Sequence, residues 1–115
     1  MPFRDDATRL RDIVACIALI EQFVAGMDFQ AYQKEEKTKS AVERQLLTLS
    51  EAAKALGERA ETLCPGHDWK GLRGMGDLLR HAYHRIDDQL VWDSVTRELP
   101  PLKKSVEEAL LRISS

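Results

Sequence analysis

The chain has 115 residues and a formal net charge of −2, because 17 Lys and Arg residues face 19 Asp and Glu residues. This length fits one domain, residues 1–115, and the near-neutral charge argues against a protein that coats nucleic acid. A hydrophobic fraction of 43% and a charged fraction of 31% exclude a disordered chain. Two cysteines are too few for a disulfide scaffold and indicate a reducing compartment.

No stretch of the sequence approaches the roughly 18 apolar residues that a membrane helix needs. The first residues, Met-Pro-Phe-Arg-Asp-Asp, carry acids where a secretion signal has basic residues and an apolar run. We therefore expect a cytoplasmic protein without a membrane segment.

Apolar residues at steps of three and four predict a first helix over residues 5–24. Asp5 or Asp6 is expected to cap its start, and Gly26 to end it. Cys16 lies beside the apolar stripe, and we interpret it as a buried thiol rather than a reactive one. The stripe consists of Leu10, Ile13, Ile17, Ile20 and Val24.

The most regular pattern predicts a second helix that carries an apolar seam at alternating steps of four and three. Its second half is rich in small residues, which allow a neighbouring helix to approach closely. Glu51 lies off this seam, so it is either an exposed carboxylate or one that faces a polar site on a partner. The seam consists of Val42, Leu46, Leu49, Ala53, Leu56, Ala60 and Leu63.

The second half of the chain shows three further helical segments separated by breaks. Asp68 is expected to cap a helix over residues 69–86, and Asp87-Asp88 to end it and cap another over 89–98. Pro100-Pro101 is expected to break the chain again before a final helix. We find no strand-like alternation, so the sequence predicts an all-α, antiparallel up-and-down bundle of four to five helices.

The segment 69–86 is unusual because Gly71, Gly74 and Gly76 fall within six residues. Each glycine inside a helix costs about 0.5–1 kcal/mol relative to alanine, which indicates close approach of another backbone or a ligand. On a helical wheel, one arc is apolar and the opposite arc is polar, with Tyr83 at the margin of the apolar one. The apolar arc holds Leu72, Met75, Leu78, Leu79, Ala82 and Ile86, and the polar arc holds Arg73, Asp77, Arg80, His81 and His84.

The polar arc carries the residue types that phosphodiester transfer requires. Histidine can act as general acid or base, and arginine can stabilise the charge that develops on the phosphorane. Asp77 precedes His81 by four residues and is expected to accept a ring N–H and fix its tautomer. RNA is the natural substrate, because its own 2′-hydroxyl supplies the nucleophile and neither metal nor cofactor is needed. A metal site at His81 and His84 is disfavoured by the arginines nearby, and a solvated, salt-bridged helix face is the simple alternative.

Six motifs follow in order along almost the whole chain: Asp28-Phe29, residues 41–46 with 49–54, Trp69, His81-Ala82-Tyr83, Val91-Trp92 and residues 98–103. In this order they resemble the HEPN superfamily and within it the HepT-like toxins. The resemblance implies a bundle that dimerises through the helix carrying the motif, and metal-independent RNA cleavage in the cleft between two copies. It also implies a cognate minimal nucleotidyltransferase antitoxin that adenylylates a tyrosine. His81 matches the catalytic histidine and Tyr83 the modified tyrosine.

The chain departs from this family where Gly-Met-Arg-Asn is usual before the histidine, because it reads Gly74-Met75-Gly76-Asp77. Gly76 replaces the motif arginine. Arg80 is the better placed substitute for its charge, and Arg73 is the other candidate if the helix bends.

Two hypotheses follow, and a third explains less of the sequence. The first is a ribonuclease toxin with His81, Arg80 and Asp77 as catalytic residues and Tyr83 as the control point. The second is a non-catalytic helical module that binds a nucleotidyltransferase, with the glycines packed in an interface. The third, a coiled-coil-like dimeriser, leaves the glycines and the polar arc without a role. In the first two, the protein is expected to form a dimer or a higher even-numbered oligomer.

The charge is unevenly distributed along the sequence. Residues 70–85 contain Lys70, Arg73, Arg80 and Arg85 against Asp77 alone, which gives 4 − 1 = +3, so the rest of the chain carries −2 − 3 = −5. One basic helix on an acidic scaffold is compatible with a small RNA-cleaving cleft.

Overall fold

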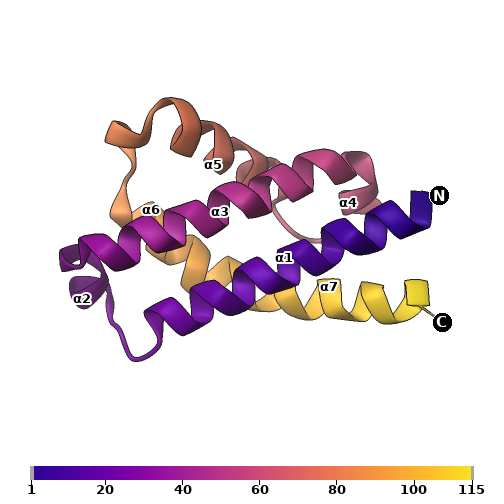
Figure 1. Ribbon diagram of the computed structural model, residues 1–115, viewed down its shortest axis with the longest axis horizontal. Helices are drawn as coiled ribbons and strands as arrows, with labels where there is room; N and C mark the ends of the chain where they lie inside the picture. The colour runs from indigo at the N-terminus through magenta and orange to yellow at the C-terminus, as the bar shows by residue number, and fades with distance from the viewer. Residues whose placement is uncertain (1, 115) are drawn as a thin grey trace.

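The computed structural model describes residues 2–114, with side chains for residues 5–82 and 84–113. Four long helices alternate in direction along the bundle (Figure 1), which confirms the predicted all-α, up-and-down architecture. These are α1 (Pro2–Val24), α3 (Glu36–Leu56), α5 (Trp69–His81) and α7 (Leu99–Ser114). Shorter helices connect them, namely α2 (Phe29–Lys34), α4 (Glu58–Leu63) and α6 (Asp88–Asp93).

The core forms where α1 and α3 bury their predicted apolar stripes. Helix α1 packs against both α3 and α7, whereas α5 packs mainly against α3 (Figure 1). The α3 seam is buried from Val42 to Ala60, and the α1 stripe from Leu10 to Ile20. Because α5 has one principal neighbour, one side of it is covered and another is left open.

The second predicted helix is interrupted at Gly57, where the backbone φ is +59°. This left-handed conformation favours glycine, and it ends α3 and begins α4. The Gly57 N–H donates to the carbonyls of Ala53 and Lys54, at 3.2 Å each. The seam nevertheless continues across the break, because Ala60 on α4 is fully buried.

Helix α5 ends at His81, so the prediction that it reaches residue 86 is wrong. Ala82 leaves the helical conformation (φ −143°, ψ 39°), and a 3₁₀ turn, η1, follows over Tyr83–Arg85. The Asp87 carboxylate then caps α6 by accepting from the Gln89 N–H at 2.9 Å, as expected. Asp88 pairs with Lys39 in the first turn of α3 at 3.1 Å, which joins the start of α6 to α3.

The break predicted at Pro100-Pro101 is also wrong. Helix α6 continues through a wide π-helical turn, η2 (Ser94–Glu98), directly into α7. In this turn the Leu99 N–H donates to the Ser94 carbonyl five residues earlier. The two prolines then fall in the first turn of α7, where their missing N–H groups are tolerated.

The start of α1 also differs from expectation. Asp5 and Asp6 lie inside α1 rather than at its cap, and the buried Asp6 carboxylate accepts from Arg59 Nε at 2.7 Å. Gly26, with φ +77°, follows the end of α1 as predicted. Cys16 is buried, and burial raises the pKa of its thiol to about 11, which agrees with an unreactive thiol. None of the described helices is both long and apolar enough to span a membrane.

Candidate functional site

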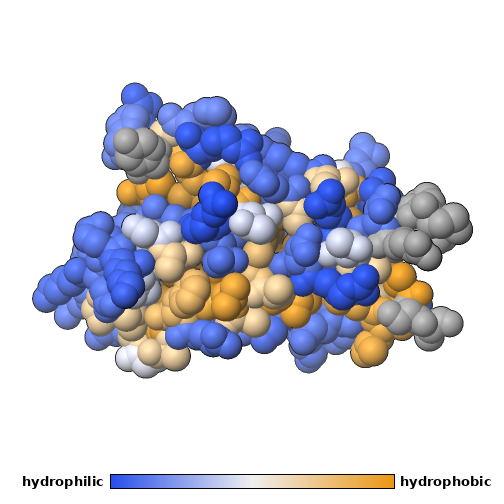
Figure 2. Space-filling model, in the orientation of Figure 1, coloured by the Kyte–Doolittle hydropathy of each residue, from blue (hydrophilic) through white to orange (hydrophobic). Residues whose placement is uncertain are grey.

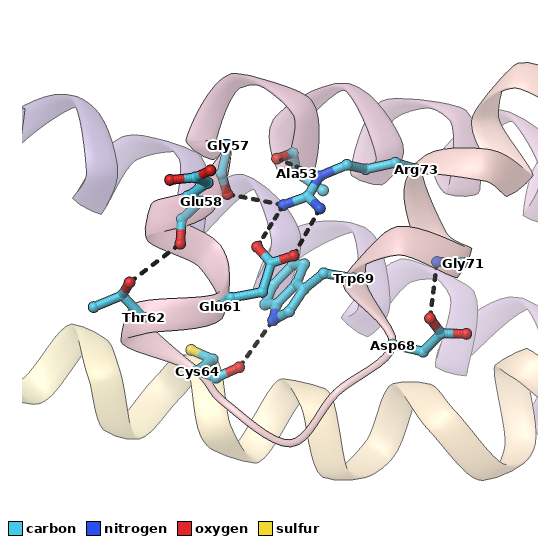
Figure 3. A network of polar contacts seen from close by, with 10 residues as sticks. All are labelled: Ala53, Gly57, Glu58, Glu61, Thr62, Cys64, Asp68, Trp69, Gly71 and Arg73. Atoms are coloured by element: carbon cyan, nitrogen blue, oxygen red, sulfur yellow. Dashed lines mark hydrogen bonds and ion pairs between the residues drawn. The ribbon is translucent and has the colours of Figure 1, made fainter.

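The first turn of α5 is fixed firmly to the body of the protein. The Asp68 carboxylate caps the helix as predicted, accepting from the Gly71 N–H at 2.9 Å. Trp69 is 1% exposed, and its indole N–H donates to the Cys64 carbonyl at 2.8 Å (Figure 3). This end of α5 therefore has a fixed position.

Midway along α5, Gly76 is buried against Ser50 of α3. A Cβ atom at position 76 would lie 1.8 Å from Ser50 Oγ and 2.4 Å from Ser50 Cβ, which is impossible without movement. The Ser50 hydroxyl donates to the Arg73 carbonyl at 3.3 Å, so this buried polar side chain is satisfied on α5. The residue at the position of the motif arginine thus faces α3, and the close approach expected from the glycines occurs here.

The other two glycines of α5 have different environments. A Cβ at Gly71 would collide with the capping Asp68 carboxylate, at 2.2 Å from its Oδ2. Gly74 is exposed, and a Cβ there would meet nothing within 4 Å. Packing within the chain therefore explains Gly76, capping explains Gly71, and neither explains Gly74.

Arg73 is held by every nitrogen of its guanidinium (Figure 3). Nε donates to the Ala53 carbonyl at 3.3 Å, and Nη2 to the Gly57 carbonyl at 2.8 Å. Nη1 and Nη2 also donate to the two carboxylate oxygens of Glu61, at 2.9 and 2.8 Å. These bonds lower the pKa of Glu61 and raise that of Arg73. Arg73 therefore joins α5 to the junction of α3 and α4 and has little capacity left for a ligand.

Arg80, the last residue but one of α5, is held by a single bond. Its Nη2 donates to Glu51 Oε1 of α3 at 2.6 Å, and the two side chains are 38% and 59% exposed. No other hydrogen bond of this guanidinium occurs within the described part of the chain. An arginine has five N–H donors, so Arg80 can bind an anion while Glu51 still holds it.

Asp77 pairs with a lysine of α3. Its carboxylate accepts a hydrogen bond from Lys54, which lowers the pKa of Asp77, with the charges of Arg80 and His81 adding to the effect. The expected hydrogen bond from His81 to Asp77 is not formed, so in this structure Asp77 acts on His81 only through its charge.

His81 is exposed at the last residue of α5, and no described residue is hydrogen-bonded to its ring. His84 lies in η1 and therefore does not continue the α5 surface, in contrast to the wheel projection. The backbone of Tyr83 is in the same turn, but its side chain lies outside what the structure describes. Among the described residues, no group of three His, Cys, Asp or Glu side chains is placed to hold a metal ion.

Sequence reasoning missed most of the partners of the polar arc. Lys54 and Glu61 carry no sequence signal, because they pair with residues 23 and 12 positions away, respectively. Glu51 was distinguishable, since it interrupts an apolar stretch, and it is both exposed and paired with Arg80 of the same chain. The polar arc is thus anchored to α3 and α4 at Arg73, Asp77 and Arg80, and His81 lies beyond these contacts.

Known proteins resemble this chain over nearly all of its length. A family model described as Ribonuclease HepT-like matches residues 13–109. A provisionally named RNase of Methanocaldococcus jannaschii is 34% identical over 110 residues, covering 96% of this chain and 91% of the relative. A provisionally named ribonuclease HepT of Thermococcus cleftensis is 34% identical over 99 residues, covering 86% and 90%. No solved structure matches the chain significantly.

Proposed function

Because the chain belongs to the ribonuclease HepT-like family, as its sequence motifs indicated, we propose that it is a metal-independent endoribonuclease and the toxin of a prokaryotic toxin–antitoxin module. The observation that carries this proposal is the exposed His81 beside Arg80, whose guanidinium keeps unused N–H donors. The first supplies proton transfer and the second supplies charge stabilisation. His81 is exposed at the last residue of α5, and the neighbouring Arg80 is 38% exposed where it meets Glu51 of α3.

The proposed reaction uses the substrate's own 2′-hydroxyl. Neutral His81 takes the 2′-hydroxyl proton, and the 2′-oxygen attacks the adjacent phosphorus. Arg80 binds the non-bridging oxygens as their charge increases. The bond from phosphorus to the 5′-oxygen breaks, and this oxygen leaves with a proton from a second, protonated His81. The products are a 2′,3′-cyclic phosphate and a 5′-hydroxyl.

The second His81 comes from a second copy of the chain. We propose a homodimer, or a higher even-numbered oligomer, in which two α5 helices face one cleft. Each copy contributes a net charge of +3 over residues 70–85, so the cleft attracts RNA although the whole chain is slightly acidic.

The proposed regulatory partner is a minimal nucleotidyltransferase antitoxin. We propose that both proteins are located in the cytoplasm. Its target is Tyr83, two residues after His81 in the family signature. Addition of AMP to this tyrosine places a bulky anionic group beside the catalytic histidine, which repels RNA and inhibits cleavage.

The experiment is cleavage of a defined RNA by the purified protein in the presence of EDTA. We expect 2′,3′-cyclic phosphate ends, and a rate at least about 100-fold lower for His81→Ala. Expression without a partner should arrest growth, and His81→Ala should relieve the arrest. Intact RNA and normal growth with the wild-type protein would contradict the proposal.

One observation favours a second candidate, a non-catalytic module that binds a nucleotidyltransferase. The motif arginine is absent, and Gly76 in its place is packed against Ser50 rather than directed to solvent. This candidate predicts that His81→Ala and Arg80→Met change nothing measurable, whereas a nucleotidyltransferase still binds the wild-type chain. RNA cleavage that depends on Arg80 would exclude it.

A further inference from the structure

Gly74 is the glycine of α5 that nothing within the chain explains. Its φ is not in the left-handed region, and a Cβ there meets no atom within 4 Å. Glycine inside a helix costs about 0.5–1 kcal/mol relative to alanine. A position that accepts alanine sterically, and would gain stability from it, is expected to keep glycine only if the space is used by something outside the chain.

The space beside Gly74 is a cavity of about 320 Å³ between α5 and the α6–η2 segment. Its walls are mainly apolar, and Leu78 and Leu90 on either side are 40% and 49% exposed. Exposed leucines that face each other across a cavity form a surface suited to a flat apolar group. The cavity, called the α5–α6 pocket below, is lined by Asp68, Gly71, Leu72, Gly74, Met75, Leu78, Leu90, Ser94 and Glu98.

The polar groups of the α5–α6 pocket select the kind of ligand. Its charged members, Asp68 and Glu98, are both carboxylates, and no lysine or arginine lines it. Burial raises the pKa of Glu98, and the charges of Asp68 and Asp93 raise it further. A group that donates hydrogen bonds would relieve this crowding of negative charge, whereas a phosphate would be repelled.

Ser94 adds a second polar contact. Its side chain lines the pocket, and the residue is 3% exposed. The pocket thus offers one hydroxyl beside carboxylate acceptors.

The α5–α6 pocket and His81 lie along one stripe of α5. Gly71, Gly74, Leu78 and His81 are spaced by three, four and three residues, which places them on one side of a helix. His81 follows Leu78 by less than one turn, about 4.5 Å along the axis. A ligand in the pocket would therefore border the proposed cleavage site.

We propose that the α5–α6 pocket binds one nucleobase of the RNA next to the cleaved bond, and that it selects a base with an exocyclic amino group. Leu78 and Leu90 hold the ring, which lies against the helix backbone at Gly74. The Glu98 carboxylate accepts from the amino group, and the Ser94 hydroxyl bonds to the neighbouring ring atom. Adenine, cytosine and guanine carry such an amino group, whereas uracil presents carbonyl oxygens that face the carboxylates. This inference rests on the proposed ribonuclease function.

The first test measures the cleavage of oligonucleotides that contain a single ribonucleotide. Each of the four bases is placed in turn on either side of the cleaved bond. We expect uracil to be cleaved at least about tenfold more slowly at one of the two positions. Glu98→Gln, whose amide can also donate, should reduce this discrimination, and Gly74→Leu should abolish it by filling the pocket. Glu107→Gln, an exposed change on α7, is the matched control and should leave it unchanged.

A binding measurement separates this inference from the proposed function. The chain has three methionines, of which Met75 lines the pocket and Met27 lies outside it. With ¹³C-labelled methionine methyl groups, adenosine or cytidine should shift the Met75 signal, uridine should not, and Met27 should stay constant. Such shifts without RNA cleavage would retain the pocket and reject the ribonuclease.

Four results would overturn the pocket assignment. One is cleavage without base preference, and another is a preference that Glu98→Gln and Gly74→Leu do not change. The third is a Gly74→Leu protein that becomes monomeric in sedimentation and loses cleavage at all four bases alike, which would make the pocket a contact between two copies of the chain. Absence of a Met75 shift with every nucleoside would count against it as well.

Discussion

The two ends of α5 carry similar residues in opposite circumstances. At the first end, Arg73 uses all three guanidinium nitrogens to bind two backbone carbonyls and both oxygens of Glu61. At the other end, Arg80 makes one hydrogen bond, to an exposed carboxylate. Residue type and wheel position made these arginines alternative sources of the missing charge. Their bonds distinguish them, because an arginine can stabilise a substrate only with donors that the protein has not already used.

Both arginines face α3, and between them Gly76 packs against Ser50 of α3. In Figure 2 the surface around these helices is largely hydrophilic, with apolar residues visible beneath it. The first part of α5 thus serves to fix the helix, and the last turn presents its side chains to solvent.

The largest effect is expected when the motif arginine is restored. Gly76→Arg places a charged side chain where even a Cβ would lie 1.8 Å from Ser50 Oγ. We expect the free energy of unfolding to fall by about 3 kcal/mol or more, measured by urea denaturation. The double change Gly76→Arg with Ser50→Gly should recover part of the loss. A fully stable Gly76→Arg protein would show that position 76 is not packed as described.

Removal of the fixed arginine is expected to have the next largest effect. Arg73→Met breaks the links from α5 to Ala53, Gly57 and Glu61, and charged hydrogen bonds of this kind contribute appreciably to stability. We expect a loss of about 2 kcal/mol in the free energy of unfolding, since Arg73 is only 22% exposed. RNA cleavage, measured where the variant is still folded, should be reduced far less than in Arg80→Met. The reverse order would interchange the roles of the two arginines.

Acid should weaken the contact between α5 and its neighbours. Hydrogen bonds from Lys54 and Arg73 lower the pKa values of Asp77 and Glu61 in the folded protein. A carboxylate whose pKa is lowered by folding stabilises the protein at pH values above its pKa in the unfolded chain, about 4. This stabilisation is lost as the pH falls through its lower pKa in the folded protein. The melting temperature should therefore decrease below about pH 4 more steeply in the wild type than in Asp77→Asn/Glu61→Gln. Parallel curves would mean that these pairs do not stabilise the fold.

The smallest effect concerns the two neighbouring glycines. Gly74→Ala should raise the free energy of unfolding by about 0.5–1 kcal/mol, because a Cβ there meets nothing and alanine favours the helix. Gly76→Ala, matched in chemistry and two residues away, should lower it because its Cβ collides with Ser50. Equal shifts in the two urea midpoints would contradict the assigned environments.

Local sequence patterns predicted the bundle well, since the stripes of α1 and α3 recur at helical spacing and are buried as expected. These patterns failed where contacts between residues far apart in the sequence determine the structure. The π turn at Ser94–Glu98 places Pro100 and Pro101 in the first turn of a continuing helix, and no local signal indicates this. Leu78, on the apolar arc of the helical wheel, is 40% exposed, because α5 has no second helix packed firmly against that side.

The candidate site was predicted in composition but not in its connections. His81, Arg80 and Asp77 were identified from residue type and helical spacing. Their actual partners, Glu51 and Lys54, lie on α3 and are 29 and 23 residues away from the residues they bind. Such pairs depend on how two helices dock, which one stretch of sequence does not specify. The Asp77 carboxylate therefore binds Lys54 rather than the His81 ring.

The most direct test of this account is the rate of RNA cleavage by Arg80→Met under single-turnover conditions, with urea unfolding of the same sample. Because the pair with Glu51 is exposed, we predict that the free energy of unfolding changes by less than about 1 kcal/mol. Because the guanidinium stabilises the reacting phosphate, the cleavage rate should fall at least about 100-fold. Unchanged cleavage by a folded Arg80→Met protein would contradict the assignment of the catalytic end of α5.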